Sequence, residues 1–166
     1  MLTNERGLTL AEILVAVAVI GLGLVGLAVV IPVSSYAVQE GNQLTTATFL
    51  AEQMVERARA AAWTGAPAAD CLGVSTANAA PVPTGATCGG ATTTQFPDET
   101  SAAGVSGYPR YTRIVRVQDC GATPCAGVTD AALRLVTVTV TYTPLTGTGQ
   151  SPAPKTVSLE WLVTQK

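Results

Sequence analysis

An uncharged apolar stretch near the N-terminus restricts this chain more than any other feature. From Ile13 to Val33 the sequence holds no charged residue, and the next charge is Glu40. As an α-helix with a rise of about 1.5 Å per residue, the stretch would extend roughly 30 Å, the thickness of a bilayer's hydrocarbon core. The sequence therefore predicts a transmembrane helix.

Two features of this helix are not needed by a simple membrane anchor. Glu12 lies at its N-terminal edge, where an unpaired carboxylate costs on the order of a few kcal/mol in hydrocarbon, so we expect a partner for it. The helix also contains glycines, each of which weakens a helix by about 1 kcal/mol relative to alanine. We expect them to allow close packing or local unwinding; they are Gly21, Gly23 and Gly26.

The residues that open the stretch resemble a known processing signal. A short polar leader ends in Gly7, and residues 8–12 (LTLAE) then lead into the apolar run. This order is similar to the cleavage and assembly signal of the type IV pilins and the pseudopilins of type II secretion. The resemblance implies that a prepilin peptidase cuts after Gly7 and N-methylates Leu8, and that Glu12 acts in assembly. It departs from the commonest pattern in having Leu8 instead of Phe or Met, and in placing Pro32 a few residues later than many major pilins do.

Two simpler signals account for less of the N-terminus. A secretory signal peptide has an apolar core of roughly 7–15 residues and an A-x-A-like cleavage site, but the run here is longer and has an acid at its start. A generic signal anchor explains the length, yet it gives no role to Glu12. It would make the chain a membrane-anchored periplasmic binding domain that never polymerises, which is the alternative from another functional class.

Composition excludes several functions. The chain has 166 residues, a net charge of −2 and a pI near 5.0, so nothing attracts it to nucleic acid. It has no histidine, which excludes histidine-based triads and histidine metal ligands. No nucleophile and base occur in a recognisable order. We therefore expect no catalytic site, no cofactor and no metal.

Charge placement predicts the topology. Arg6 precedes the apolar run and the next basic residue is Arg57, so the positive-inside tendency favours a cytoplasmic N-terminus and a periplasmic head. An even number of cysteines in a domain outside the cytoplasm predicts disulfides. Of the three connectivities, sequence proximity favours the local pairs Cys71–Cys88 and Cys120–Cys125.

An amphipathic helix is predicted from residue 34 to residue 63. Glu52, Glu56, Arg57 and Arg59 fall on its polar side, and the pair Gly41-Asn42 is a weak point. Its apolar residues recur at spacings of three and four. They are Leu44, Ala47, Leu50 or Ala51, Met54, Val55, Ala58 and Ala62.

Residues 64–109 show no periodicity and are rich in proline and glycine, which predicts a long loop region. A Cys71–Cys88 bridge would hold it in place. The loop carboxylates Asp70, Asp98 and Glu99 match no calcium-loop spacing, so we expect them on a solvated surface.

Three strands are predicted in residues 110–166. Alternation runs from Tyr111 to Gln118, from Leu133 to Thr143 and from Lys155 to Gln165. A long helix, a loop and an antiparallel sheet make an α+β domain, which is the order of the pilin fold. The run LRLVTVTVTY is also similar to the central strand of PilV-type minor pilins and of I-type pseudopilins.

The expected organisation is a leader (1–7), a transmembrane and assembly helix (8–33) and a periplasmic head (34–166). The resemblance implies a structural subunit, not an enzyme: a minor pilin of a type IV pilus or of its initiation complex, or else a type II secretion or competence pseudopilin. Its implied partners are the prepilin peptidase, other pilins through the N-terminal helix, the inner-membrane assembly platform and the lipid bilayer. It would lie in the bacterial inner membrane as a single-pass protein and then in the filament at the cell surface.

Overall fold

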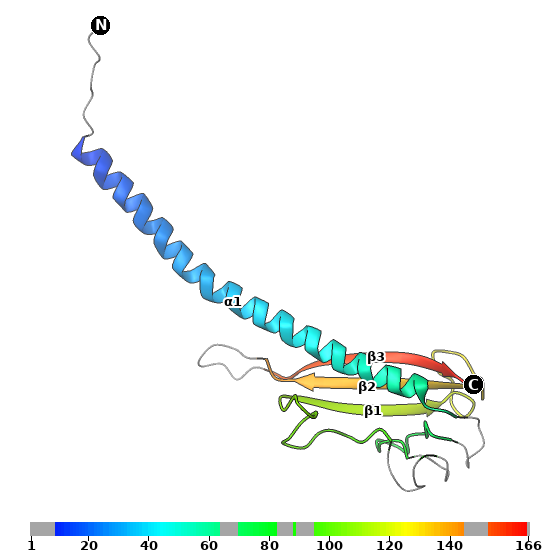
Figure 1. Cartoon of the computed structure of the whole chain (residues 1–166). Helices are drawn as coiled ribbons and strands as arrows, with labels where there is room; N and C mark the ends of the chain where they lie inside the picture. Colours follow the sequence, from blue (N-terminus) through cyan, green and yellow to red (C-terminus); the bar gives the residue numbers. More distant parts are fainter. Residues whose placement is uncertain (1–8, 64–69, 83–87, 89–94, 145–152, 166) are drawn as a thin grey trace. The chain divides into compact units, whose positions relative to one another are not determined.

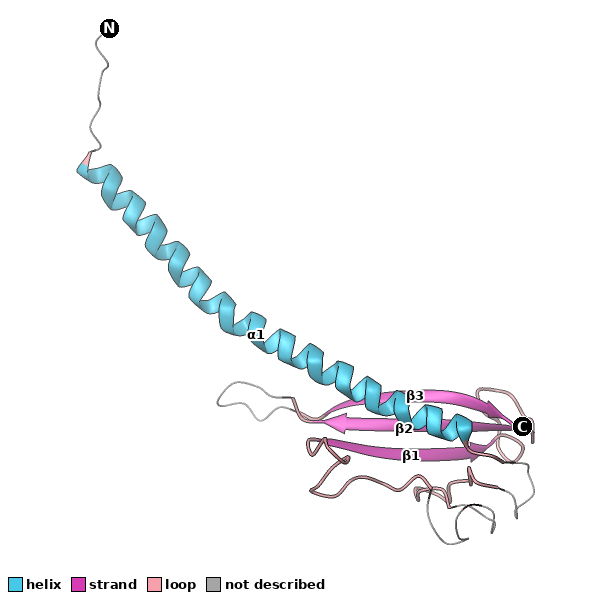
Figure 2. Cartoon of the chain, in the orientation of Figure 1, coloured by secondary structure: helices cyan, strands magenta, loops and turns pink. Residues whose placement is uncertain are grey.

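The computed structural model describes residues 9–63, 70–82, 88, 95–144 and 153–165. Figures 1 and 2 show one long helix, α1 (Leu10–Ala60), followed by strands β1 (Tyr111–Asp119), β2 (Leu133–Tyr142) and β3 (Lys155–Thr164). The predicted α+β class, a long apolar helix followed by a small antiparallel sheet, is confirmed. The chain forms two compact units, residues 1–40 and 41–166, and their boundary lies at the Gly41-Asn42 pair.

The first unit contains the N-terminal part of α1. Every described side chain from Thr9 to Gln39 is exposed, including the whole apolar run. By length and composition, this part of α1 is apolar enough to cross a membrane. The helix continues through Pro32, which has no N–H to donate. Just beyond it, the hydroxyls of Ser34 and Ser35 donate to the carbonyl of Ile31 at 2.8 and 3.1 Å.

The second unit is the head, and its centre is an antiparallel sheet in the order β1-β2-β3. Val138 of β2 lies opposite Val115 of β1 on one side and Leu159 of β3 on the other. Side chains of β1 and β2 alternate strictly between buried and half-buried, as the period-two pattern predicts. The valines of β2 form the buried face and its threonines the outer one.

The C-terminal part of α1 covers the buried face of the sheet (Figure 1). The residues of α1 that enter this core are Ala47, Leu50, Ala51, Met54, Val55 and Ala58. Two predicted members of this stripe are wrong. Leu44 has the right phase but lies one turn before the first buried residue and is 49% exposed, while Ala62 is exposed beyond the end of the helix.

Arg113 points into this core from β1 and joins three parts of the head. Its guanidinium pairs with Glu99 of the loop, with Nε 2.6 Å from Oε2. Its Nη1 donates to the carbonyl of Leu50 at 2.9 Å and to Oε1 of Gln53 at 3.1 Å. The buried charge therefore fixes both the loop and the helix to the sheet, because an unpaired charge at this position would be strongly unfavourable.

Arg134, at the start of β2, also fixes the loop to the sheet through a buried ion pair. Its guanidinium forms a two-point ion pair with the buried carboxylate of Asp70, and its Nη1 lies 2.8 Å from Oδ1. The guanidinium also lies over the ring of Trp63, with its carbon 4.2 Å from the ring centroid. Backbone N–H groups of Leu72 and Gly73 complete the shell of the carboxylate at 3.0 Å each. Burial raises the pKa of Asp70, but these hydrogen bonds and the charge of Arg134 together hold it below its usual value.

We expect alanine substitutions at two neighbouring residues of α1 to lower the stability of the head by different amounts. Leu50→Ala should lower the free energy of unfolding by about 2–5 kcal/mol, because a fully buried side chain leaves a cavity. Phe49→Ala is the matched control, since Phe49 is 53% exposed and Leu50 only 1%. Denaturant unfolding of the detergent-solubilised chain measures both; equal losses would contradict the packing described here.

We expect acidic pH to lower the free energy of unfolding of the head, because it protonates the carboxylate of Asp70. Its folded-state pKa lies below the unfolded value of about 3.9, so its contribution is complete above that pH and is lost as the pH falls through the folded-state pKa. Asp70→Asn should remove this part of the acid dependence and, by breaking a buried pair, cost about 3–5 kcal/mol at neutral pH. Asp98→Asn, at a more exposed ion pair, should cost about 1 kcal/mol or less. Thermal unfolding between about pH 2 and pH 7 tests both, and identical acid profiles for wild type and Asp70→Asn would refute the assignment.

Candidate functional site: the N-terminal signal

The carboxylate of Glu12 is held by the residue that precedes α1. The backbone N–H and the hydroxyl of Thr9 both donate to Oε2 of Glu12 at 3.0 Å. In return, the backbone N–H of Glu12 donates to the hydroxyl oxygen of Thr9 at 3.3 Å. This reciprocal arrangement is a capping box, in which two otherwise unpaired N–H groups at the start of a helix are satisfied by side chains.

Thr9 is the residue that the sequence analysis missed. The signal for it was present, since T-x-x-E before an apolar run is the pattern of a capping box. The partner expected for Glu12 is thus supplied in part by its own chain. All three of these hydrogen bonds involve Oε2 or the backbone N–H of Glu12, and no described residue donates to Oε1. Gly7 and Leu8, the predicted cleavage and methylation positions, lie outside the described residues.

The glycines of the apolar stretch lie on open helix surface. A Cβ added at Gly21, Gly23 or Gly26 would meet no described atom within 4 Å. No described residue therefore requires their small size. If their size matters, it does so towards molecules outside this chain, through close packing or a local unwinding of α1.

The loop of the head is closed by a disulfide between Cys71 and Cys88, whose Cα atoms are 5.4 Å apart. The backbone N–H of Cys71 also donates to the carbonyl of Ala62 at 2.7 Å, which fixes the chain just after α1. This is the first of the two local pairings favoured by sequence proximity.

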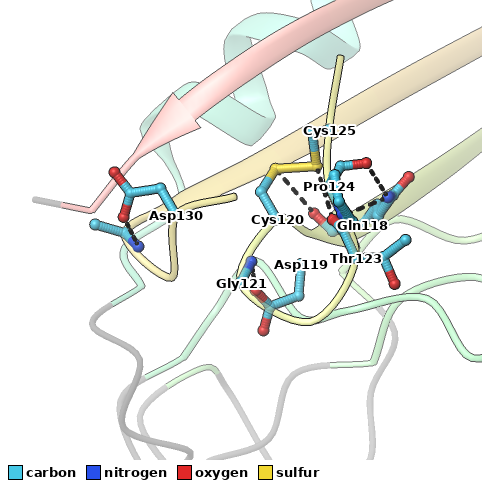
Figure 3. The surroundings of a disulfide bond; sticks show 9 residues. Gln118, Asp119, Cys120, Gly121, Thr123, Pro124, Cys125 and Asp130 are labelled. Carbon is cyan, nitrogen blue, oxygen red and sulfur yellow. Dashed lines mark hydrogen bonds between the residues drawn. A yellow bond between two sulfur atoms is a disulfide. The ribbon is translucent and has the colours of Figure 1, made fainter. Parts of the chain in front are cut away.

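The second disulfide closes the turn between β1 and β2 (Figure 3). Cys120 and Cys125 are joined with their Cα atoms 5.1 Å apart. Asp119 accepts from the backbone N–H of Gly121 at 2.8 Å, and the amide of Gln118 donates to two carbonyls of the ring. The ring is therefore braced from the end of β1, and every cysteine of the chain is paired.

The three loop carboxylates do not form a calcium site. Each is bound to an arginine of the sheet instead: Asp70 to Arg134, Asp98 to Arg116 and Glu99 to Arg113. The expectation that Asp70 lies on a solvated surface is wrong, because its pairing with Arg134 allows it to be buried. Among the described residues, no three His, Cys, Asp or Glu side chains gather in a way that could hold a metal ion.

Comparison with protein families identifies the N-terminal signal. Residues 2–28 match the model of the prokaryotic N-terminal methylation motif. No curated protein and no solved structure matches the chain. The matched segment contains residues 2–7 of the predicted leader, Thr9, Glu12 and all three glycines of the apolar stretch. The chain therefore carries the class III prepilin signal of the type IV pilins and pseudopilins, in front of a pilin-like α+β head.

Proposed function

We propose that this protein is a structural subunit, a minor pilin that enters a type IV filament or its initiation complex. The observation that carries the proposal is the methylation motif on an exposed apolar helix whose first turn holds a carboxylate. A soluble domain has no use for a helix surface that is apolar and uncovered from Ile13 to Val33. Lipid covers that surface before assembly, and the apolar helices of other subunits cover it afterwards.

The route begins in the inner membrane, with the N-terminus in the cytoplasm and the head in the periplasm. A prepilin peptidase cuts after Gly7 and methylates the new amino group of Leu8. Glycine suits that position because the enzyme must approach the backbone closely, and a side chain would obstruct it. Pseudopilins of type II secretion and of competence systems follow the same route. They differ from a minor pilin in the filament that receives the subunit.

Glu12 supplies the specificity of assembly in this proposal. Its Oε2 caps its own helix, and no donor in the part of the chain that the structure describes reaches Oε1, which can accept a cation. After cleavage, the amino group of Leu8 lies about 6 Å along the axis of the same helix, at about 1.5 Å per residue. The amino group of a neighbouring subunit, shifted along the filament axis, meets the same carboxylate in a bundle of apolar helices. An unpaired carboxylate is unfavourable in such apolar surroundings. Every axial register between subunits that leaves Glu12 unpaired is therefore destabilised.

Processing is tested by the intact mass of the chain extracted from membranes. We expect a mature protein that begins at Leu8 and carries one added methyl group. Gly7→Val should retain the leader, because the side chain obstructs the peptidase. A wild-type chain that still begins at Met1, or that is cut near Ala28, would exclude a pilin-type subunit and favour an anchor or a signal peptide.

The role of the carboxylate in assembly is tested by variants that separate charge from capping. Glu12→Gln keeps the capping box, since glutamine also serves at that position, but removes the negative charge. We expect it to be inserted and cleaved normally yet lost from sheared filaments. Thr9→Ala weakens the cap by about 0.5–2 kcal/mol and keeps the charge, so it should still be recovered.

The measurement is the ratio of filament protein to membrane protein for each variant. Glu12→Ala, which loses both cap and charge, should behave as Glu12→Gln does. Equal recovery of wild type and Glu12→Gln would show that the charge has no part in assembly. Loss of Thr9→Ala together with full recovery of Glu12→Gln would assign the whole effect to the helix cap.

A further inference from the structure

A groove of about 480 Å³ opens in the head between α1 and the edge strand β3. Its floor is apolar and consists of Val55 from the helix with Leu159 and Trp161 from the strand. Trp161, which lies opposite Val136 on the helix side of the sheet, is 46% exposed. Large side chains uncovered along a sheet edge mark a surface that a partner can bury.

The backbone of β3 is open on the same side. No described residue pairs with the other edge of β3 from Thr156 to Thr164, so this stretch of the strand can accept a further strand (Figure 1). The opposite edge of the sheet is different, because Glu99 bridges to Arg113 and the N–H of Ser75 donates to the carbonyl of Val117. The strand contains no proline and only two charged residues, so it lacks the usual devices that block edge pairing.

The charges around the groove select its occupant. Arg59 is already engaged, since it pairs with Glu56 at 2.7 Å and lies 4.9 Å from the ring centroid of Trp161. Glu52 lines the groove on the helix side, whereas Glu160 alternates with Leu159 and Trp161 and so lies on the outer face of β3; both are exposed, and neither forms an ion pair with a described residue. The groove therefore presents an apolar floor and unpaired negative charge beside an open strand edge.

We propose that this groove binds an extended segment of a partner protein, in which apolar and basic residues alternate, as a fourth strand beside β3. Backbone hydrogen bonds to the strand edge would give affinity, apolar side chains of the partner would cover the floor, and its basic side chains, on the other face of the strand, would meet Glu160. A second copy of this chain fits poorly, because pairing β3 with β3 would bring the same carboxylates of both copies together. The binding does not depend on filament assembly, so it can be tested on unassembled protein.

The test uses the full chain in detergent and a fluorescently labelled, acetylated peptide, VKVTVKV, with anisotropy as the readout. Two analogues serve as controls: VEVTVEV reverses the charge, and a version of VKVTVKV methylated at alternate backbone nitrogens keeps the side chains but loses the strand donors. We expect VKVTVKV to bind and each analogue to bind at least about tenfold more weakly, a difference of roughly 1.4 kcal/mol.

Variants of the protein locate the site. Glu160→Gln should weaken peptide binding about 2–5-fold, the worth of one exposed ion pair, and Trp161→Ala should weaken it by removing part of the apolar floor, whereas Asp98→Asn removes a charge outside the groove and should leave it unchanged. No binding of VKVTVKV, equal binding of its N-methylated analogue, or indifference to the groove variants would overturn the proposal. Self-association of the chain that the groove variants abolish would assign the surface to a second copy and overturn it as well.

Discussion

Alanine at three positions of α1 sets how the helix meets the sheet. Ala47, Ala51 and Ala58 are fully buried, and their small side chains allow the helix backbone to lie close to the valines of β1 and β2. Leu50 and Met54 fill the space between them. Because the helix lies close, the guanidinium of Arg113 can reach the carbonyl of Leu50 from the sheet. The rest of the head is arranged around this contact.

Ion pairs with arginines of the sheet, and not regular secondary structure, fix the long loop of the head. Arg113 and Arg134 rise from the buried face of the sheet and take Glu99 and Asp70 from the loop as their counterions. A buried guanidinium without a partner would be strongly destabilising, so each pair restricts where its loop segment can lie. These pairs join the described parts of the loop to the sheet, and the Cys71–Cys88 disulfide links two points of the loop to each other.

The parts of this structure that the sequence predicts are those with a local pattern. Alternation in Val136, Val138 and Val140 identifies β2, and spacings of three and four identify the helix face from Ala47 to Ala58. The pairing of Arg134 with Asp70 has no such pattern, because it joins residues 64 apart in the chain through the fold itself. The capping box was readable, since Thr9 and Glu12 are only three residues apart.

The two units of the chain have separate roles in the proposed function: the second folds into the head, and the first serves assembly. Every described residue of the buried core lies after Gly41, so the core is built within the second unit. The described side chains of the apolar run are exposed, and a Cβ added at its glycines would meet no described atom within 4 Å. In the proposed function, lipid and then other subunits cover this surface. Glu12 belongs to the same division: within the described residues, capping its own helix occupies Oε2 alone, and the assembly contact proposed for it uses Oε1.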